Sequence, residues 1–440
     1  MRGASDYGAD LKLSVIRAHR SSVEEEAAPE TGTAGLARRF TIWSLAVTAA
    51  CLPLYVVRWH YGPLPTTLLE TLILITVAAY AVTLWTEKRW PSRTPYDIPI
   101  ALWLIAGVLG IVAAPDHVKA LGIYRAYFLE AVAIFYVAVD MLRTRDDMRK
   151  LLPLAAASAA IYSVGQIVSF VYVAAHHQLQ LGDAPAFLNM TPNADAMYLE
   201  PPLAFAIGFV LFPWSKRMRL IASGLLALIL LAMLLTLSRA GYLAMAVLAV
   251  VLVLSLSNRR ARIWTVAALA LVGLIVLEVP FINQRIATIG SSAGLRTSLY
   301  GQALHVIALN PILGAGIDGF PIRVAPFRPG TQAIELYPHD VWLTTWSEVG
   351  LLGVIVLAVI VFTLLWRGAR ALSETNDAYR PILWGCVGAL ILFVMHGFFD
   401  SPYWKNDFSV EFWLVAALEV AAIRGSTTLR GQPFRPPAHA

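Results

Sequence analysis

A histidine and several arginines flank the late apolar segments of this chain, and their chemistry sets the first expectations. His339 stands just before an apolar stretch that runs from Val341 to Trp366. Its neutral imidazole can accept a proton near pH 7, because the ordinary pKa of histidine is about 6.5. The polar segment upstream, residues 281–338, holds Arg285, Arg296, Arg323 and Arg328. These residue types predict a site that binds phosphate and accepts a proton beside a membrane.

Arg239 is a second candidate for phosphate binding. It lies in Leu237-Ser238-Arg239-Ala240-Gly241, between two apolar runs. A snorkelling arginine in a tight turn is the alternative interpretation. However, an arginine at membrane depth costs about 2.5–3.5 kcal/mol on insertion scales, which favours a negatively charged partner. Since guanidinium binds phosphate through two parallel hydrogen bonds, we expect Arg239 and Arg296 to act in this way.

The elements that position these residues are predicted to be membrane helices. The chain has 440 residues, of which 58% are hydrophobic and only 14% are charged. Runs of about 20 apolar residues span a bilayer, and lipid allows only helices or closed barrels. Because the apolar runs are continuous and do not alternate, the sequence predicts an all-α integral membrane protein. Cys51 and Cys386 lie in these runs and do not suggest disulfides.

We predict about twelve transmembrane helices, with a large periplasmic loop between the ninth and the tenth. The expected spans are roughly 40–58, 64–86, 96–114, 119–142, 151–175, 197–213, 219–237, 240–257, 262–280, 340–366, 381–399 and 408–423. The remaining segments are a mostly disordered N-terminal tail (1–39), the loop 281–338 and a C-terminal tail (424–440). Within the loop we predict a helix from Leu295 to Leu309, with Leu295, Leu299, Ala303 and Val306 near one face.

The distribution of basic residues predicts the topology. Alternate loops carry Lys88, Arg89 and Arg93, then Arg143, Arg145, Arg149 and Lys150, then Lys216, Arg217 and Arg219, then Arg259, Arg260 and Arg262, then Arg367 and Arg370. By the positive-inside rule these loops and both termini are cytoplasmic. The loops 281–338 and 176–196, the latter with His176 and His177, then face outward. The net charge of +6 therefore indicates topology and not binding of nucleic acid.

Two sequence patterns resemble nucleotide or nucleophile motifs but lack the necessary context. The segment from Gly314 to Gly319 matches the dinucleotide fingerprint without a preceding strand, so we interpret it as an irregular turn. The segment from Gly290 to Gly294 matches a nucleophile elbow without its strand-turn-helix setting. The sequence contains no Asp-x-Asp pair that would indicate a metal site. We therefore expect neither a metal nor a cofactor.

The late part of the chain resembles the O-antigen ligase/polymerase family of bacterial envelope enzymes. Three blocks carry the resemblance: Leu237 to Tyr242; Arg296 followed by Asn310 to Gly316 and Gly319-Phe320; and His339-Asp340 with Leu343 and Glu348 to Gly353. They cover roughly residues 225–365. The family usually has asparagine after the histidine, whereas this chain has Asp340, which either caps the next helix or raises the basicity of His339.

The resemblance implies a glycosyltransferase in the bacterial inner membrane that acts at the periplasmic face. Its donor would be a glycan on undecaprenyl diphosphate, and its acceptor lipid A-core or another glycan. Arg239 and Arg296 would hold the diphosphate, and His339 would be the catalytic base. Further candidates for supporting roles are Asp340, Arg285, Arg323, Arg328 and Glu348. The reaction would be metal-independent and would invert the anomeric carbon.

Alternatives from other classes remain open at this stage. A transporter with twelve helices would share the composition, although the short connection from Trp214 to Arg219 does not resemble the long central linker of major-facilitator proteins. A non-catalytic protein that binds lipid-linked glycan would use the same arginines but would not need His339. Within the enzyme hypothesis, the sequence does not distinguish a ligase from a polymerase.

Overall fold

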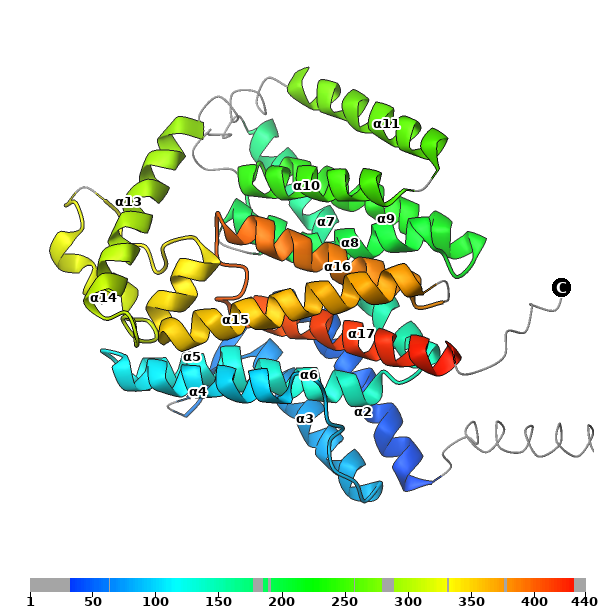
Figure 1. Cartoon of the computed structure of the whole chain (residues 1–440), viewed down its shortest axis with the longest axis horizontal. Helices are drawn as coiled ribbons and strands as arrows, with labels where there is room; N and C mark the ends of the chain where they lie inside the picture. The colour runs from blue at the N-terminus through cyan, green and yellow to red at the C-terminus, as the bar shows by residue number, and fades with distance from the viewer. Residues whose placement is uncertain are drawn as a thin grey trace, which may run out of the picture.

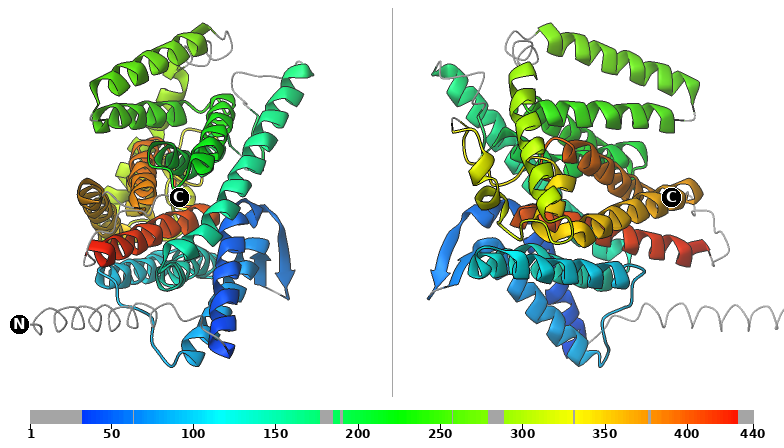
Figure 2. Two further views of the ribbon diagram at one scale, coloured as in Figure 1. Left: turned by 90° about the vertical axis from the view of Figure 1, so that its right-hand side faces the viewer. Right: turned by 60° about the vertical axis from the view of Figure 1, so that its left-hand side comes forward.

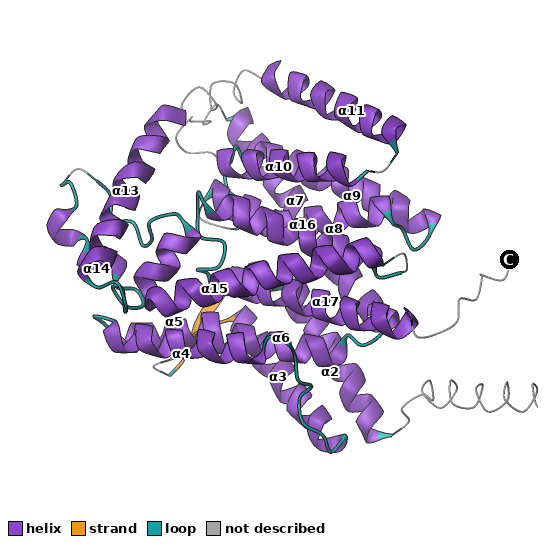
Figure 3. Cartoon of the chain, viewed as in Figure 1, coloured by secondary structure: helices purple, strands orange, loops and turns teal. Residues whose placement is uncertain are grey.

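The computed structural model describes residues 32–430, apart from residues 63, 177–184, 189–190, 257, 279–288, 331 and 376–377. The protein is mostly helical, with 79% helix and 2% strand, as Figure 3 shows. This composition confirms the prediction that the protein is built mainly from α-helices. Arg285 falls outside the described residues, whereas the segment that resembled a nucleophile elbow, Gly290 to Gly294, forms the beginning of a helix, Ile289–Leu309.

The helices follow one another with short connections. In chain order the elements are α2 (Thr33–Ala50), η1 (Leu52–Val56), β1 (Arg58–Tyr61), β2 (Leu64–Thr67), α3 (Leu68–Thr86), α4 (Asp97–Ala113), α5 (His117–Tyr124), η2 (Arg125–Leu129), α6 (Glu130–Met141), α7 (Arg145–Ala175), α8 (Pro192–Leu211), α9 (Lys216–Leu235), α10 (Arg239–Ser255), α11 (Arg259–Glu278), α13 (Ile289–Leu309), α14 (Phe320–Arg323), η3 (Ala325–Phe327), α15 (Val341–Glu374), α16 (Arg380–Gly397) and α17 (Asn406–Arg430).

Each predicted span overlaps a helical segment of the structure. Among the described residues, seven helical segments are long and apolar enough to cross a membrane, counting α5 to α6 as one segment, and α4 and α10 are shorter apolar helices. The chain is therefore a multi-pass membrane protein. The total of twelve spans stays a prediction, because length and composition alone do not show which of the remaining helices cross the bilayer.

The helices form a bundle with two different ends. α16 packs against α8, α10, α15 and α17. Figure 1 shows the start of α2 and the end of α17 on the right, whereas α13 and α14 lie on the left. α11 lies outermost, beside α10, and the views in Figure 2 also show it at the edge of the bundle. The loop helices thus gather at the end of the bundle opposite these chain ends.

The N-terminal region departs from the prediction in two places. α2 begins at Thr33, whereas the first span was expected from residue 40 after a disordered tail. Its early start is stabilised by Arg38, whose guanidinium lies 3.0 Å from the carboxylate of Asp147. In addition, β1 and β2 form an antiparallel hairpin where the sequence predicted the end of one span and the start of the next. The alternation of Trp59 and Tyr61 with polar residues is typical of a strand, but the segment is very short.

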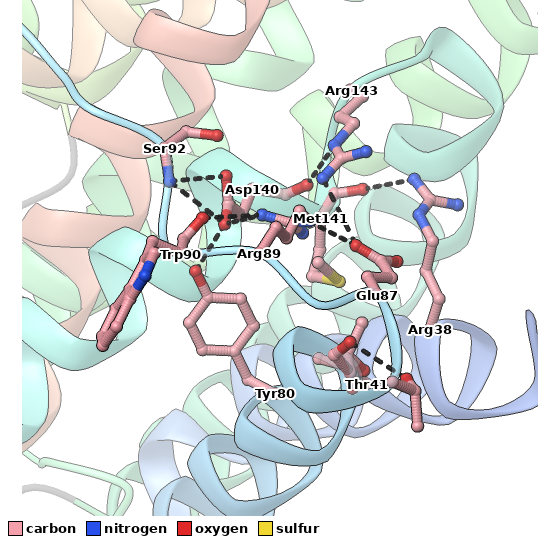
Figure 4. Close-up of polar contacts among 12 residues, drawn as sticks. Arg38, Thr41, Tyr80, Glu87, Arg89, Trp90, Ser92, Asp140, Met141 and Arg143 are labelled. Atoms are coloured by element: carbon pink, nitrogen blue, oxygen red, sulfur yellow. Dashed lines mark hydrogen bonds and ion pairs between the residues drawn. The ribbon is translucent and has the colours of Figure 1, made fainter. Parts of the chain in front are cut away.

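A network of ion pairs joins the helix ends that were predicted to be cytoplasmic (Figure 4). Asp140, at the end of α6, accepts hydrogen bonds from the Tyr80 hydroxyl at 2.5 Å and from Arg89 at 2.7 Å. The backbone N–H of Ser92 also donates to it, at 3.2 Å. Since Arg89 is one of the arginines that indicated topology, this residue also has a structural role at the bundle end.

The segment that resembled a dinucleotide motif is packed between α4 and α15. The backbone N–H of Ala315 donates to Ser347 in α15 at 2.6 Å, and that of Ile317 donates to Gly110 in α4 at 3.0 Å. At Gly350, α15 is kinked, with φ of 73°. A Cβ atom there would lie 2.0 Å from the carbonyl oxygen of Ile312. The irregular turn was therefore predicted correctly, and its glycines serve close backbone packing.

Candidate functional site

A polar pocket of about 140 Å³ lies at the end of the bundle that carries α13. Its lining brings together three of the predicted site residues, Arg239, Arg296 and His339. These residues come from the start of α10, from α13 and from the segment before α15. The remaining lining residues are Thr191, Pro192, Asn193 and Asp400. Residues far apart in the chain therefore meet at one site.

His339 is held between two carboxylates. Its Nδ1 lies 3.1 Å from Asp400, and its Nε2 lies 3.3 Å from Glu335, four residues earlier in the chain. Its backbone has φ of 57°, a left-handed conformation that is uncommon for residues other than glycine. The hydroxyl of Tyr300 in α13 donates to its carbonyl oxygen at 3.2 Å. Such conformations persist where surrounding contacts determine them, and they are concentrated at functional sites.

The two carboxylates control the protonation of His339. Burial lowers the pKa of the imidazole, but the negative charge of Asp400 and hydrogen bonds to Asp400 and Glu335 raise it to about 10. Conversely, although burial raises the pKa of Asp400, the charge of His339 holds it below its usual range. The hydrogen bond from His339 likewise lowers the pKa of Glu335. At neutral pH the pocket therefore contains an imidazolium between two carboxylates.

Asp400 is fixed in place by contacts beyond His339. It accepts hydrogen bonds from the side chain of Asn193 and from the backbone N–H of Ser401, each at 2.8 Å. A few residues later, the hydroxyl of Tyr403 accepts from Trp103 at 3.0 Å and from Trp413 at 3.1 Å. These buried aromatic contacts hold the connection between α16 and α17, so the carboxylate of Asp400 has little freedom to move.

Arg239 is placed by the cap of its helix. Ser238 caps α10 by accepting a hydrogen bond from the backbone N–H of Gly241 at 3.1 Å. The same hydroxyl donates to Asn193 at 2.7 Å. Asn193 thus connects the helix that begins with Arg239 to Asp400 and, through it, to His339. At Gly241 a Cβ atom would lie 3.0 Å from that of Ala196, so this glycine permits α8 and α10 to approach closely.

Arg296 reaches the pocket from α13. The predicted apolar face of this helix is correct at Leu299, Ala303 and Val306, which are buried against Phe320 and Val324. It is wrong at Leu295, which is exposed. Arg296 lies on another side, with its guanidinium carbon 5.8 Å from the centre of the Phe399 ring. Packing of the apolar face therefore turns Arg296 toward the residue that precedes Asp400.

The comparison with protein families now bears on this pocket. Residues 224–358 match the family described as O-antigen ligase. This match identifies an O-antigen ligase domain in the chain and supports its membership of the O-antigen ligase/polymerase family. The matched part contains Arg239, Arg296 and His339, which were predicted from the three sequence blocks. A comparison with curated proteins gave no match.

The candidates for supporting roles lie elsewhere in the O-antigen ligase domain. Asp340 caps α15, accepting from the backbone N–H groups of Trp342 at 2.9 Å and Leu343 at 2.8 Å. Glu348 is buried and accepts from the backbone N–H of Asp318. Neither they nor Arg323 and Arg328 line the pocket. Arg285 lies outside the described residues.

Three residues of the O-antigen ligase site escaped the sequence interpretation. The sequence interpretation assigned no role to Asp400, Asn193 or Glu335. Glu335 is only four residues from His339, but this segment is not helical, so the spacing alone did not predict their contact. Asp400 follows His339, and Asn193 precedes it, by long stretches of chain. Only the fold brings these residues together.

Proposed function

We propose that this O-antigen ligase family member transfers a glycan from undecaprenyl diphosphate to an acceptor hydroxyl. The observation that carries the proposal is the pocket that places His339 beside Arg239 and Arg296. Guanidinium groups bind phosphate oxygens in pairs and keep their charge at every physiological pH. In this pocket they would hold the diphosphate and stabilise the negative charge that develops on it as it leaves.

In the proposed reaction, His339 removes the proton of the acceptor hydroxyl. The acceptor oxygen forms a bond to the anomeric carbon as the bond between that carbon and the diphosphate oxygen breaks. Direct displacement of this kind inverts the anomeric carbon. Asp400 orients the imidazole through Nδ1 and stabilises its charged form. Neutral His339 is required for proton removal, so the imidazolium has to lose a proton first.

The proposed location of the reaction is the periplasmic side of the bacterial inner membrane. The basic loops indicate that the ends of the bundle near the start of α2 and the end of α17 are cytoplasmic. α13, whose Arg296 lines the pocket, lies at the opposite end (Figure 1). A polyprenyl chain could remain in the bilayer while its diphosphate enters the pocket. The acceptor, whether lipid A-core or another glycan, would approach from the periplasm.

The deciding experiment is glycan transfer by the purified protein from an undecaprenyl-diphosphate-linked donor, with and without EDTA. We expect transfer that survives EDTA and is lost in His339→Ala. Arg370→Ala serves as a control, because Arg370 is exposed and pairs with Glu374 away from the pocket. Transfer that persists in His339→Ala would remove His339 as the base. Substrate uptake into proteoliposomes without transfer would support a transporter, and donor binding without transfer would support a non-catalytic binding protein.

A further inference from the structure

The carboxylate of Glu335 contacts Nε2 of His339, the imidazole nitrogen that would have to accept a proton in the proposed reaction. With Asp400 on Nδ1 and Glu335 on Nε2, both ring nitrogens of His339 already have a carboxylate partner. A nitrogen that donates to a carboxylate cannot accept a proton from a hydroxyl. One of the two carboxylates therefore has to leave before His339 can act as a base.

The contacts of the two carboxylates show which one can leave. Asp400 is anchored by Asn193 and by the backbone of Ser401, and its side chain is 12% exposed. The side chain of Glu335 is 29% exposed, and within the described residues His339 is its hydrogen-bond partner. Breaking one contact releases Glu335, whereas departure of Asp400 would leave the half-buried amide of Asn193 and the backbone N–H of Ser401 without this partner. Glu335 is thus the displaceable carboxylate.

We propose that the acceptor hydroxyl binds where the carboxylate of Glu335 lies. The hydroxyl replaces this carboxylate at Nε2 of His339, and this exchange converts His339 into a base. This inference rests on the proposed function. When the carboxylate leaves, the imidazolium loses one of its two anionic partners and releases its Nε2 proton to water. The neutral nitrogen then accepts a hydrogen bond from the acceptor hydroxyl and takes its proton as the new glycosidic bond forms.

The other charged groups near His339 favour this exchange. Arg239 from α10 and Arg296 from α13 line the same pocket, so both place positive charge on the side where the diphosphate binds. Asp400, from the connection between α16 and α17, remains on Nδ1. Without Glu335, the imidazole has one carboxylate partner instead of two, so its protonated form is less stabilised. With Glu335 in place, His339 therefore stays protonated and inactive.

The protonation of His339 can be measured without any transfer assay. Diethyl pyrocarbonate reacts with neutral imidazole, and mass spectrometry of the peptide containing His339 reports its extent. The full chain in detergent is labelled between about pH 6 and about pH 10.5, a range that brackets ordinary and raised histidine pKa values. We expect Glu335→Gln to lower the midpoint of His339 labelling by about one pH unit or more. Gln332→Ala is the matched control, because Gln332 lies in the same segment and contacts Ser298 and Gln302.

The outcomes separate this inference from the proposed function. An unchanged midpoint in Glu335→Gln overturns the inference, and so does faster labelling at every pH with the same midpoint, which would indicate steric unmasking alone. A lowered midpoint in Gln332→Ala would also contradict it. In a transfer assay, Glu335→Gln should lower the KM for the acceptor and leave the KM for the donor unchanged. Absence of transfer by the wild-type protein would reject the proposed function but not the labelling result.

Discussion

The carboxylate of Asp400 lies 3.1 Å from Nδ1 of His339, although 61 residues separate them in the chain. Asp400 is itself held by Asn193, which also binds the cap of the helix that begins with Arg239. One chain of hydrogen bonds therefore connects the proposed base to a proposed phosphate ligand. A displacement of His339 or of the start of α10 would therefore change the position of the other.

Replacement of Asp400 by asparagine should lower the rate of glycan transfer by about 10²-fold or more, within the range attributed to general-base catalysis. The amide would no longer stabilise the positive charge that His339 acquires in the reaction. Initial rates at saturating donor test this expectation. Asp116→Asn is a suitable control, because Asp116 caps α5 away from the pocket. A rate equal to that of the wild type would contradict a role for Asp400.

Conversion of Arg239 or Arg296 to lysine should raise the KM for the donor by roughly tenfold, because lysine keeps the charge but cannot form two parallel hydrogen bonds to phosphate. Donor titrations at fixed acceptor concentration measure the effect. Arg370→Lys should behave like the wild type. If both pocket variants retain the wild-type KM, the diphosphate binds somewhere else.

Substitution of Gly350 by alanine should destabilise the protein by about 1–3 kcal/mol, since φ at this position is 73° and a Cβ atom would lie 2.0 Å from the carbonyl oxygen of Ile312. Thermal unfolding in detergent, followed by circular dichroism, would show a lower Tm. Gly122→Ala is the matched control, because no atom lies within 4 Å of the Cβ position of this helical glycine. Similar Tm values for the two variants would show that the kink tolerates a side chain.

The raised pKa of His339 predicts a dependence of stability on pH. The imidazole titrates near 6.5 in the unfolded chain and at about 10 in the folded protein. Its stabilising contribution is therefore complete below about pH 6.5 and is lost as the pH rises through about 10. The wild-type Tm should fall more across this interval than that of His339→Asn, whose asparagine tolerates the left-handed backbone. Parallel pH dependences in the two proteins would exclude the raised pKa.

Local patterns predicted much of the fold and part of the site. Apolar runs located the helices, and the spacing of Leu299, Ala303 and Val306 predicted the buried face of α13. The sequence blocks led to Arg239, Arg296 and His339, which the structure places at one pocket. Each of these residues has a signal in its immediate neighbourhood.

Tertiary contacts could not be predicted in the same way. The sequence offered Asp340 as a partner of His339, but the side chain of Asp340 caps α15. The carboxylate that contacts the imidazole belongs to Asp400, in a connection far along the chain. The hairpin of β1 and β2 was missed because strand pairing depends on a partner segment and not on composition alone. Likewise, the protonation of His339 depends on charges that the sequence does not place beside it.

The distribution of the pocket residues along the chain has a consequence for biogenesis. The site needs Asn193, Arg239, Arg296 and His339, and it is completed only by Asp400, next to the last helix. A chain that is still being inserted into the membrane lacks this carboxylate. Newly made protein would therefore gain a complete site only after α16 and the connection that follows it have been synthesised and have packed against α8 and α15.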